Sequence, residues 1–149
     1  MLFSKKRTPP AGSAAAASGQ QITTKRRGDA AEALAAEYLT ARGLRLLQRN
    51  FKTPGRGGGE IDLIMRAPDG TLVFVEVRQR ASASHGGAGA SITGVKQRRI
   101  IFAARHYLQR LASLPPCRFD VVLVQGDANG HQALPSLDWI RAAFDAGDH

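Results

Sequence analysis

The stretch GEIDLIMRAPDGTLVFVEVRQR, residues Gly59–Arg80, decides how this chain folds. It contains two apolar, β-forming runs, Ile61–Arg66 and Thr71–Arg80, on either side of a short turn sequence. Pro68 suits the first position of a three-residue hairpin loop, and Gly70 suits the left-handed position that closes it. We therefore predict a tight β-hairpin whose register is fixed by the turn.

The predicted register gathers acidic side chains. It sets Asp62 opposite Glu76 and Glu60 opposite Arg78, and directly opposite residues share one face of the hairpin. Two opposite carboxylates have Cβ atoms roughly 5 Å apart and repel each other. A divalent cation or a salt-bridge patch with the neighbouring arginines would offset this repulsion, and the residues alone leave both open. Oxygen-only ligands would favour Mg²⁺ or Mn²⁺.

Helical and strand patterns flank the hairpin. Residues 28–43 are predicted to form a helix that Asp29 caps, with Glu32 at the capping-box position and Gly43 at the end. A strand over Leu44–Phe51 follows. We also predict a flexible glycine-rich loop over 52–59, a loop over 81–91, a helix over 92–112, a strand over 117–127 and a short helix over 136–146.

The resulting order is α-β-β-β-α-β-α, which predicts an α/β (α+β) fold with a mixed central sheet flanked by helices. Residues 1–24 are rich in Ala, Ser, Pro and Lys without periodicity, so we expect a disordered basic tail before a single domain over 25–149.

Positive charge is unevenly distributed. The formal net charge is +9, residues 1–27 hold six basic residues and no acid, and residues 78–118 hold eight basic residues and no acid. Lys96, Arg98 and Arg99 fall in the first turns of the second predicted helix, where the helix dipole disfavours cations. Together with Arg80 they indicate either a solvated face or phosphate contacts to a nucleic acid, and both readings stay open.

Other classes of protein fit this chain poorly. Cys117 is the single cysteine, so neither an internal disulfide nor a cysteine-based zinc site is expected. No apolar run approaches the roughly 20 residues of a membrane span, and the N-terminus lacks the apolar segment of a signal peptide. We expect a cytoplasmic protein without a membrane partner.

The hairpin also carries a resemblance. IDLI followed by VFVEVRQR resembles the pattern of restriction-endonuclease-like nucleases, an Asp and then Glu-x-Lys on the next strand. With GDAAEALAAEYLTARG, LLQRNF, VKQRRI, RFDVV and WIRAAFD, the series is similar to the YraN-like family of bacterial proteins over about residues 28–145. The resemblance implies a restriction-endonuclease-like fold close to that of Holliday-junction resolvases.

The resemblance also implies roles for particular residues. Asp62 and Glu76 would bind the metal with the carbonyl of Val77, and Glu32 matches a glutamate that joins the metal site of the resolvases. Arg78 stands where the family pattern has lysine. Arginine keeps the positive charge beside a phosphate, but it cannot act as a general base near neutral pH.

Two further acids are expected near the site. Glu60 is interpreted as an outer acid or as the partner of Arg78, and Asp120 as a structural or supporting acid.

Three functional hypotheses follow from these observations. The first is a Mg²⁺- or Mn²⁺-dependent endonuclease acting on DNA, including branched or recombination intermediates, and working as a homodimer as resolvases do. The second is a nucleic-acid-binding accessory protein that keeps the nuclease fold without cleavage. The third is a protein-interaction module with charged strand ends.

Overall fold

The computed structural model describes residues 24–80, 92–126 and 135–147. The chain divides into two units, Met1–Ala30 and Ala31–His149, and all five strands belong to the second. The tail predicted over 1–24 lies outside the described residues apart from Thr24, and the loop predicted over 81–91 lies outside them entirely. Both therefore stay predictions.

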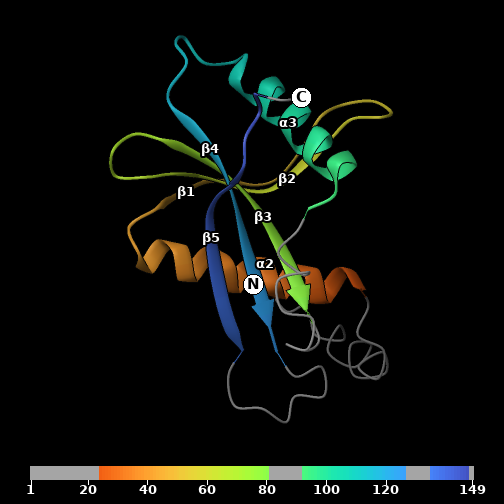
Figure 1. Ribbon diagram of the computed structural model, residues 1–149, viewed down its shortest axis with the longest axis vertical. Helices are drawn as coiled ribbons and strands as arrows, with labels where there is room; N and C mark the ends of the chain where they lie inside the picture. Colours follow the sequence, from red (N-terminus) through yellow and green to blue (C-terminus); the bar gives the residue numbers. More distant parts are fainter. Residues whose placement is uncertain (1–23, 81–91, 127–134, 148–149) are drawn as a thin grey trace, which may run out of the picture. The chain divides into compact units, whose positions relative to one another are not determined.

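One mixed sheet forms the second unit, with strand order β1-β2-β3-β4-β5. Strands β3 and β4 run parallel, as a helical crossover between them permits, and the other neighbours are antiparallel (Figure 1). This mixed sheet with two flanking helices confirms the predicted fold class and is consistent with a restriction-endonuclease-like fold. The bounds are β1 Arg45–Lys52, β2 Glu60–Arg66, β3 Leu72–Arg80, β4 Cys117–Gln125 and β5 Ser136–Phe144, with helices α2 Thr24–Ala41 and α3 Gly94–Leu108.

The hairpin of β2 and β3 forms as its turn predicts. The N–H of Ala67 donates to the carbonyl of Thr71 at 2.8 Å, and Gly70 has the left-handed φ of 95° that the loop requires. Ile64 therefore lies opposite Phe74. The predicted register is confirmed over this part of the hairpin.

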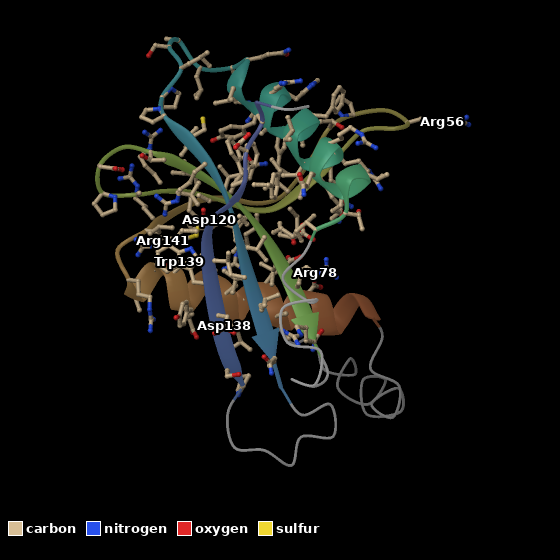
Figure 2. The ribbon with its side chains drawn as sticks, in the orientation of Figure 1. Arg56, Arg78, Asp120, Asp138, Trp139 and Arg141 are labelled. Carbon is tan, nitrogen blue, oxygen red and sulfur yellow. The ribbon has the colours of Figure 1, made fainter. Side chains whose placement is uncertain are left out.

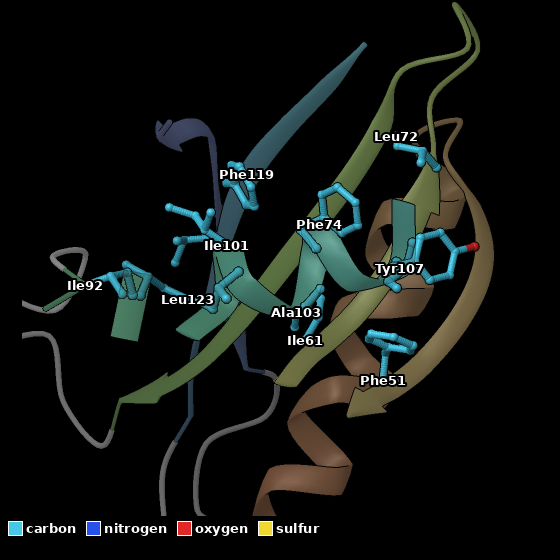
Figure 3. Close-up of a cluster of buried hydrophobic side chains, with 14 residues drawn as sticks. Phe51, Ile61, Leu72, Phe74, Ile92, Ile101, Ala103, Tyr107, Phe119 and Leu123 are labelled. Atoms are coloured by element: carbon cyan, nitrogen blue, oxygen red, sulfur yellow. The ribbon is translucent and has the colours of Figure 1, made fainter. Parts of the chain in front are cut away.

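Each face of the sheet packs against a different helix. Alternate residues of β3 go to opposite sides, because Val73 and Val75 join the cluster that contains Leu39 of α2, whereas Phe74 joins the cluster of α3. On the α3 side, Phe74 packs edge-on against Tyr107 with ring centroids 6.2 Å apart (Figure 3). Burial of both faces means that a carboxyl on β2 or β3 is largely removed from water.

Helix α2 begins earlier than its sequence signals predict. It starts at Thr24, so Asp29 and Glu32 lie inside the helix and the predicted capping box is wrong. Lys and Arg are good helix formers, so the segment before Gly28 extends the helix despite the cost of a glycine. The C-terminal end is as predicted: Gly43 has a φ of 105°, and the N–H of Leu44 donates to the carbonyl of Leu39 at 3.1 Å.

The short helix predicted over 136–146 is wrong, because this segment forms strand β5. A bulge explains the misleading pattern. Ile140 lies opposite Val121, and Phe144 lies opposite Phe119, so β5 uses four residues where β4 uses two. That spacing imitates the four-residue repeat of a helix.

Candidate functional site

Strands β2 and β3 separate at the end of the hairpin that lies away from the turn. Their ladder pairs Leu63–Arg66 with Leu72–Val75 and goes no further among the described residues. Beyond it, the N–H of Val77 donates to Oδ2 of Asp62 at 2.8 Å. The N–H and carbonyl of a strand residue point to the same edge, so the carbonyl of Val77 lies on the edge of β3 that faces β2. A side chain thus replaces the missing ladder bond.

Three acids from three elements meet at this opening. Asp62 of β2 is hydrogen-bonded through its side chain to Glu76 of β3 and to Glu32 of α2. We call these three side chains the carboxyl cluster. Asp62 and Glu76 therefore meet as predicted, although through their side chains rather than as a ladder pair. Glu32 lies inside α2 and therefore does not have the helix-capping role that the sequence suggests.

Burial controls the protonation of the carboxyl cluster. Burial raises the pKa of Glu76 to about 8, and the negative charge of Asp62 is the second cause. Burial also raises the pKa of Asp62, although the N–H of Val77 and the hydrogen bonds with Glu32 and Glu76 act in the opposite direction. The raised pKa values of both acids favour a proton shared between Asp62 and Glu76, and such a proton permits their close approach.

A lysine reaches the carboxyl cluster from helix α3. Nζ of Lys96 lies 3.7 Å from Oε2 of Glu76. The hydroxyl of Thr93 accepts the N–H of Lys96 at 3.1 Å and caps the helix, which fixes the first turn. Lys96 lowers the pKa of Glu76 more than Arg78 does. The sequence presents Lys96 only as one of several basic residues, and no local pattern marks it as a neighbour of Glu76.

Glu60 has surroundings different from those predicted. It is paired with Lys52 of β1, and no ladder pair joins it to Arg78 within the described residues. Glu60 and Lys52 line a hollow of about 190 Å³ together with Arg99 and the glycines of the intervening loop. Glu60 therefore belongs to the edge of this hollow.

The glycine-rich loop beside the hollow is closed by hydrogen bonds between its two ends, and its predicted flexibility stays a prediction. The N–H of Gly59 donates to Oγ1 of buried Thr53 at 2.8 Å, and the N–H of Thr53 donates to the carbonyl of Gly59 at 3.0 Å. A Cβ at Gly59 would lie 1.9 Å from the carbonyl oxygen of Arg99, and one at Gly58 would lie 1.9 Å from Oγ1 of Thr53. Glycine is needed here for close packing.

Asp120 has a structural role on β4. It is fully buried and accepts hydrogen bonds from Nε1 of Trp139 at 2.8 Å and from the N–H of Ala142 at 2.9 Å. Nε of Arg118 also donates to it at 3.0 Å. These hydrogen bonds join β4 to β5 and hold the bulge of β5 in place. Figure 2 shows Asp120 near Trp139, with Arg78 on β3.

The remaining predicted basic residues lie around the site. Arg98 and Arg99 are exposed on α3. Arg80 ends β3, and its Nη2 atom is buried without a hydrogen-bond partner among the described residues. Arg78 is half-buried two residues after Glu76. The structure thus brings Lys96 and Arg78 to the acids and leaves Arg98 and Arg99 toward solvent.

The carboxyl cluster has the chemistry of a hard-cation site. Its donors are oxygens alone, namely three carboxyls and the carbonyl of Val77, and these suit Mg²⁺ or Mn²⁺. Within residues 24–80, 92–126 and 135–147, no group of three or more His, Cys, Asp or Glu side chains has an arrangement that could hold a metal ion. The acids are hydrogen-bonded to each other instead. The oxygen donors are of the type that such an ion prefers, and its binding would require the acids to give up the shared proton and to move apart.

Comparison with known proteins gives a family but no activity. The model of "Uncharacterised protein family UPF0102" matches residues 31–124, a range that includes the carboxyl cluster and Lys96. A UPF0102 protein of Polaromonas naphthalenivorans is 71% identical over 126 residues, which are 84% of this chain and 82% of the relative. One of Paracidovorax citrulli is 65% identical over 125 residues, 84% of this chain and 87% of the relative.

Proposed function

Because the chain belongs to the UPF0102 (YraN-like) family, whose description names no activity, we propose its function from the site itself: a metal-dependent endonuclease that acts on DNA. One observation carries the proposal. Three carboxyls from α2, β2 and β3 converge where two core strands separate, and Lys96 and Arg78 lie beside them. A buried cluster of acids is costly to the fold, which points to a functional use.

Glu32, Asp62 and Glu76 would hold the cation, with the carbonyl of Val77 as a further oxygen donor. A bound Mg²⁺ or Mn²⁺ supplies an activated water and neutralises charge on a phosphodiester. The chain prepares this site by keeping its donors close. The N–H of Val77 fixes one oxygen of Asp62, and Lys96 orients the carboxyl of Glu76.

Two cations of the chain serve the phosphate. Arg78 follows Glu76 by two residues, and its guanidinium binds two phosphate oxygens and stabilises the charge that develops during cleavage. Arginine does not give up its proton near neutral pH, so it does not act as a base. Lys96 brings a lysine ammonium to the acids from another element, at 3.7 Å from Glu76. It supplies the lysine charge that position 78 lacks.

DNA is the proposed substrate because Lys96 and Arg78 lie beside the acids and further basic residues are exposed on α3. We include branched and recombination intermediates, and action as a homodimer, on the strength of the resolvase-like fold. The proposal places the protein in the cytoplasm because a bacterial chain that acts on DNA must meet it there. Within the described ranges, neither helix has the length and apolar composition needed to cross a membrane.

Calorimetry with Mn²⁺ tests the metal site. We expect the native chain to bind Mn²⁺ and the Asp62→Asn/Glu76→Gln variant to lose binding. The matched control is Asp69→Asn/Asp138→Asn, which removes two exposed carboxylates from a turn and from β5. Equal Mn²⁺ binding by the native chain and the Asp62/Glu76 variant would contradict the site.

Cleavage of a four-way DNA junction then tests the reaction. The nuclease proposal requires metal-dependent cleavage that is lost in the Asp62/Glu76 variant while DNA binding is kept. Arg78 favours one alternative, a nucleic-acid-binding accessory protein, because it stands where the family pattern has lysine. That alternative predicts junction binding without cleavage by the native chain, with cleavage restored by Arg78→Lys.

A further inference from the structure

The outer side of α3 combines an exposed aromatic ring with basic residues. Phe102 is 50% exposed, although it lies in a helix whose opposite side is buried in the core. Arg98 and Arg99 precede it by four and three residues, and Arg105 and His106 follow it by three and four. All four lie within about 60° of Phe102 around the helix axis. We call these five residues the α3 face.

The charges of the α3 face are available to a ligand. Helix α3 contains no acidic residue, so its cations have no counterion on their own helix. In the part of the chain that the structure describes, Arg98, Arg99 and Arg105 form no ion pair. The ring of His106 lies beside Phe102, with centroids 6.3 Å apart and planes tilted by 43°. A negatively charged ligand with planar rings would match both these arginines and the exposed ring of Phe102.

The hollow beside β1 and β2 extends the same surface. Arg99 belongs to the α3 face and also lines the hollow with Gly57 and Lys52. Glu60 is the acid of that lining, and Lys52 is its paired residue across the strands. Figure 2 shows Arg56 projecting from the tip of the adjoining loop. Positive charge thus continues from the helix to the loop.

We propose that the α3 face binds unpaired nucleotides of DNA, with a base stacked on Phe102 and the neighbouring phosphates held by Arg98, Arg99 and Arg105. In duplex DNA the bases are stacked on each other, so a lone exposed ring gains little from them. An unpaired base offers a free face to the ring. The charge complementarity of the surrounding arginines selects a nucleic acid over a neutral apolar partner.

This inference rests on the proposed action on DNA and adds a preference for single-stranded segments. Lys96 of the same helix contacts Glu76, and Phe102 lies six residues further, or about 9 Å along the helix axis. A strand of several nucleotides that stacks on the α3 face would therefore be long enough to reach the carboxyl cluster. Phe102 acts as a specificity residue and has no part in the chemical step.

The test is binding of a fluorescent oligothymidylate of about 15 nucleotides, and of a blunt duplex, to the full chain in EDTA. We expect Phe102→Ala to weaken binding of the single strand by roughly five- to hundredfold and to change duplex binding less than twofold. Phe102→Trp should keep the affinity, whereas Phe102→Leu should behave like Phe102→Ala. The control is Leu114→Ala, which removes an apolar side chain that is 75% exposed beyond the end of α3.

Salt dependence separates stacking from charge. Phe102→Ala should leave the slope of log Kd against log salt unchanged, while Arg98→Gln/Arg99→Gln should reduce it by roughly 0.7 for each phosphate that the variant no longer neutralises. Equal affinity of Phe102→Ala and Leu114→Ala for the single strand would overturn the inference. So would a Phe102 dependence seen with poly-glutamate and not with DNA, because the face would then serve an acidic protein.

The two proposals fail independently. Binding is measured in EDTA, so it does not require the carboxyl cluster or a metal. If the single strand binds through Phe102 and no DNA is cut, the nuclease proposal alone is wrong. If junctions are cut and Phe102→Ala binds the single strand as the native chain does, the stacking inference alone is wrong.

Discussion

Nζ of Lys96 on α3 lies 3.7 Å from Oε2 of Glu76 on β3, so the helix that follows the hairpin places a positive charge beside a buried carboxyl. The side chain of Glu76 is only 9% exposed, and that of Lys96 is 36% exposed. The ammonium group of Lys96 can therefore move toward a bound ligand without disturbing the packing of the core around Glu76. The energetic role of this contact can be measured.

Replacement of Lys96 by glutamine should slow DNA cleavage by about tenfold to a hundredfold, because a positive charge beside the reacting phosphate is lost. It should also raise the pKa of Glu76 further, since Lys96 lowers that pKa. Cleavage rates and a carbon NMR titration of the Glu76 carboxyl provide the two measurements. Arg45→Gln removes the same charge from an exposed position on β1 and should change neither. Equal rates for the two variants would show that Lys96 has no role in cleavage.

Asp62→Asn should stabilise the metal-free protein by about 1 kcal/mol while removing Mn²⁺ binding, because functional acids are often held at a cost to stability. The physical reason is the loss of a buried charge that raises the pKa of Glu76. Urea unfolding in EDTA measures the change. Asp69→Asn is the matched control, and its effect should have the opposite sign, because the N–H of Thr71 lowers the pKa of Asp69. A loss of stability in Asp62→Asn would contradict the prediction.

Stability of the metal-free protein should fall as the pH rises from about 4.5 to about 8. The pKa of Glu76 is 4.5 in its ordinary state and about 8 in the fold, so the folded state binds the proton more tightly. This contribution is complete below pH 4.5 and is lost as the pH rises through 8. Urea unfolding of the native chain and of Glu76→Gln at pH 5 and about pH 8 tests it. The variant should lack this part of the slope, and parallel curves would refute the assignment to Glu76.

Asp120→Ala should destabilise the fold by about 3 kcal/mol without changing the affinity for Mn²⁺. The substitution leaves Nε of Arg118 and Nε1 of Trp139 without their acceptor. Asp138→Ala, on exposed β5 surface, should stay within about 0.5 kcal/mol of the native chain. Unfolding and calorimetry provide the two readings. Weaker Mn²⁺ binding by a folded Asp120→Ala variant would assign Asp120 to the metal site.

Gly59→Ala should destabilise the protein by about 2 kcal/mol, because the new Cβ would clash with the backbone carbonyl of Arg99. Gly28→Ala should instead stabilise it by about 0.5–1 kcal/mol, since Gly28 lies within α2 and nothing within 4 Å opposes a Cβ there. Thermal unfolding of both variants measures the contrast. Similar melting temperatures for the two would show that the loop does not depend on close packing at Gly59.

Local rules predict the hairpin and the meeting of its acids. The loop at Pro68 and Gly70 sets the register of the hairpin. Because side chains alternate between the two faces of a strand, Asp62 and Glu76 then lie on the same face. Lys96 is different because its contact depends on how α3 packs on the sheet. No spacing within the sequence encodes that distance. The closure of the loop between Thr53 and Gly59 likewise depends on a hydrogen bond to the hydroxyl of Thr53 and on close packing against Arg99 of a distant helix.

The last strand shows how a local rule can mislead. Trp139, Ile140 and Phe144 have helical spacing, yet the extra residues of a bulge produce the same spacing in β5. The bulge requires a φ of 50° at Ala142, which a non-glycine residue rarely adopts, and Asp120 holds it by accepting the N–H of that residue. An interaction between residues more than twenty positions apart therefore overrides the local pattern.

The irregular edge strands also determine how the sheet can meet other chains. Strands β1 and β5 are the edges of the sheet, and each carries a register shift and a non-glycine residue with positive φ, Asn50 in β1 and Ala142 in β5. Such irregular edges are poor templates for backbone pairing, so they protect the protein against strand-by-strand aggregation. In the homodimer that we propose on a DNA junction, the two chains are therefore expected to associate through side-chain surfaces and not through a continuous ten-stranded sheet.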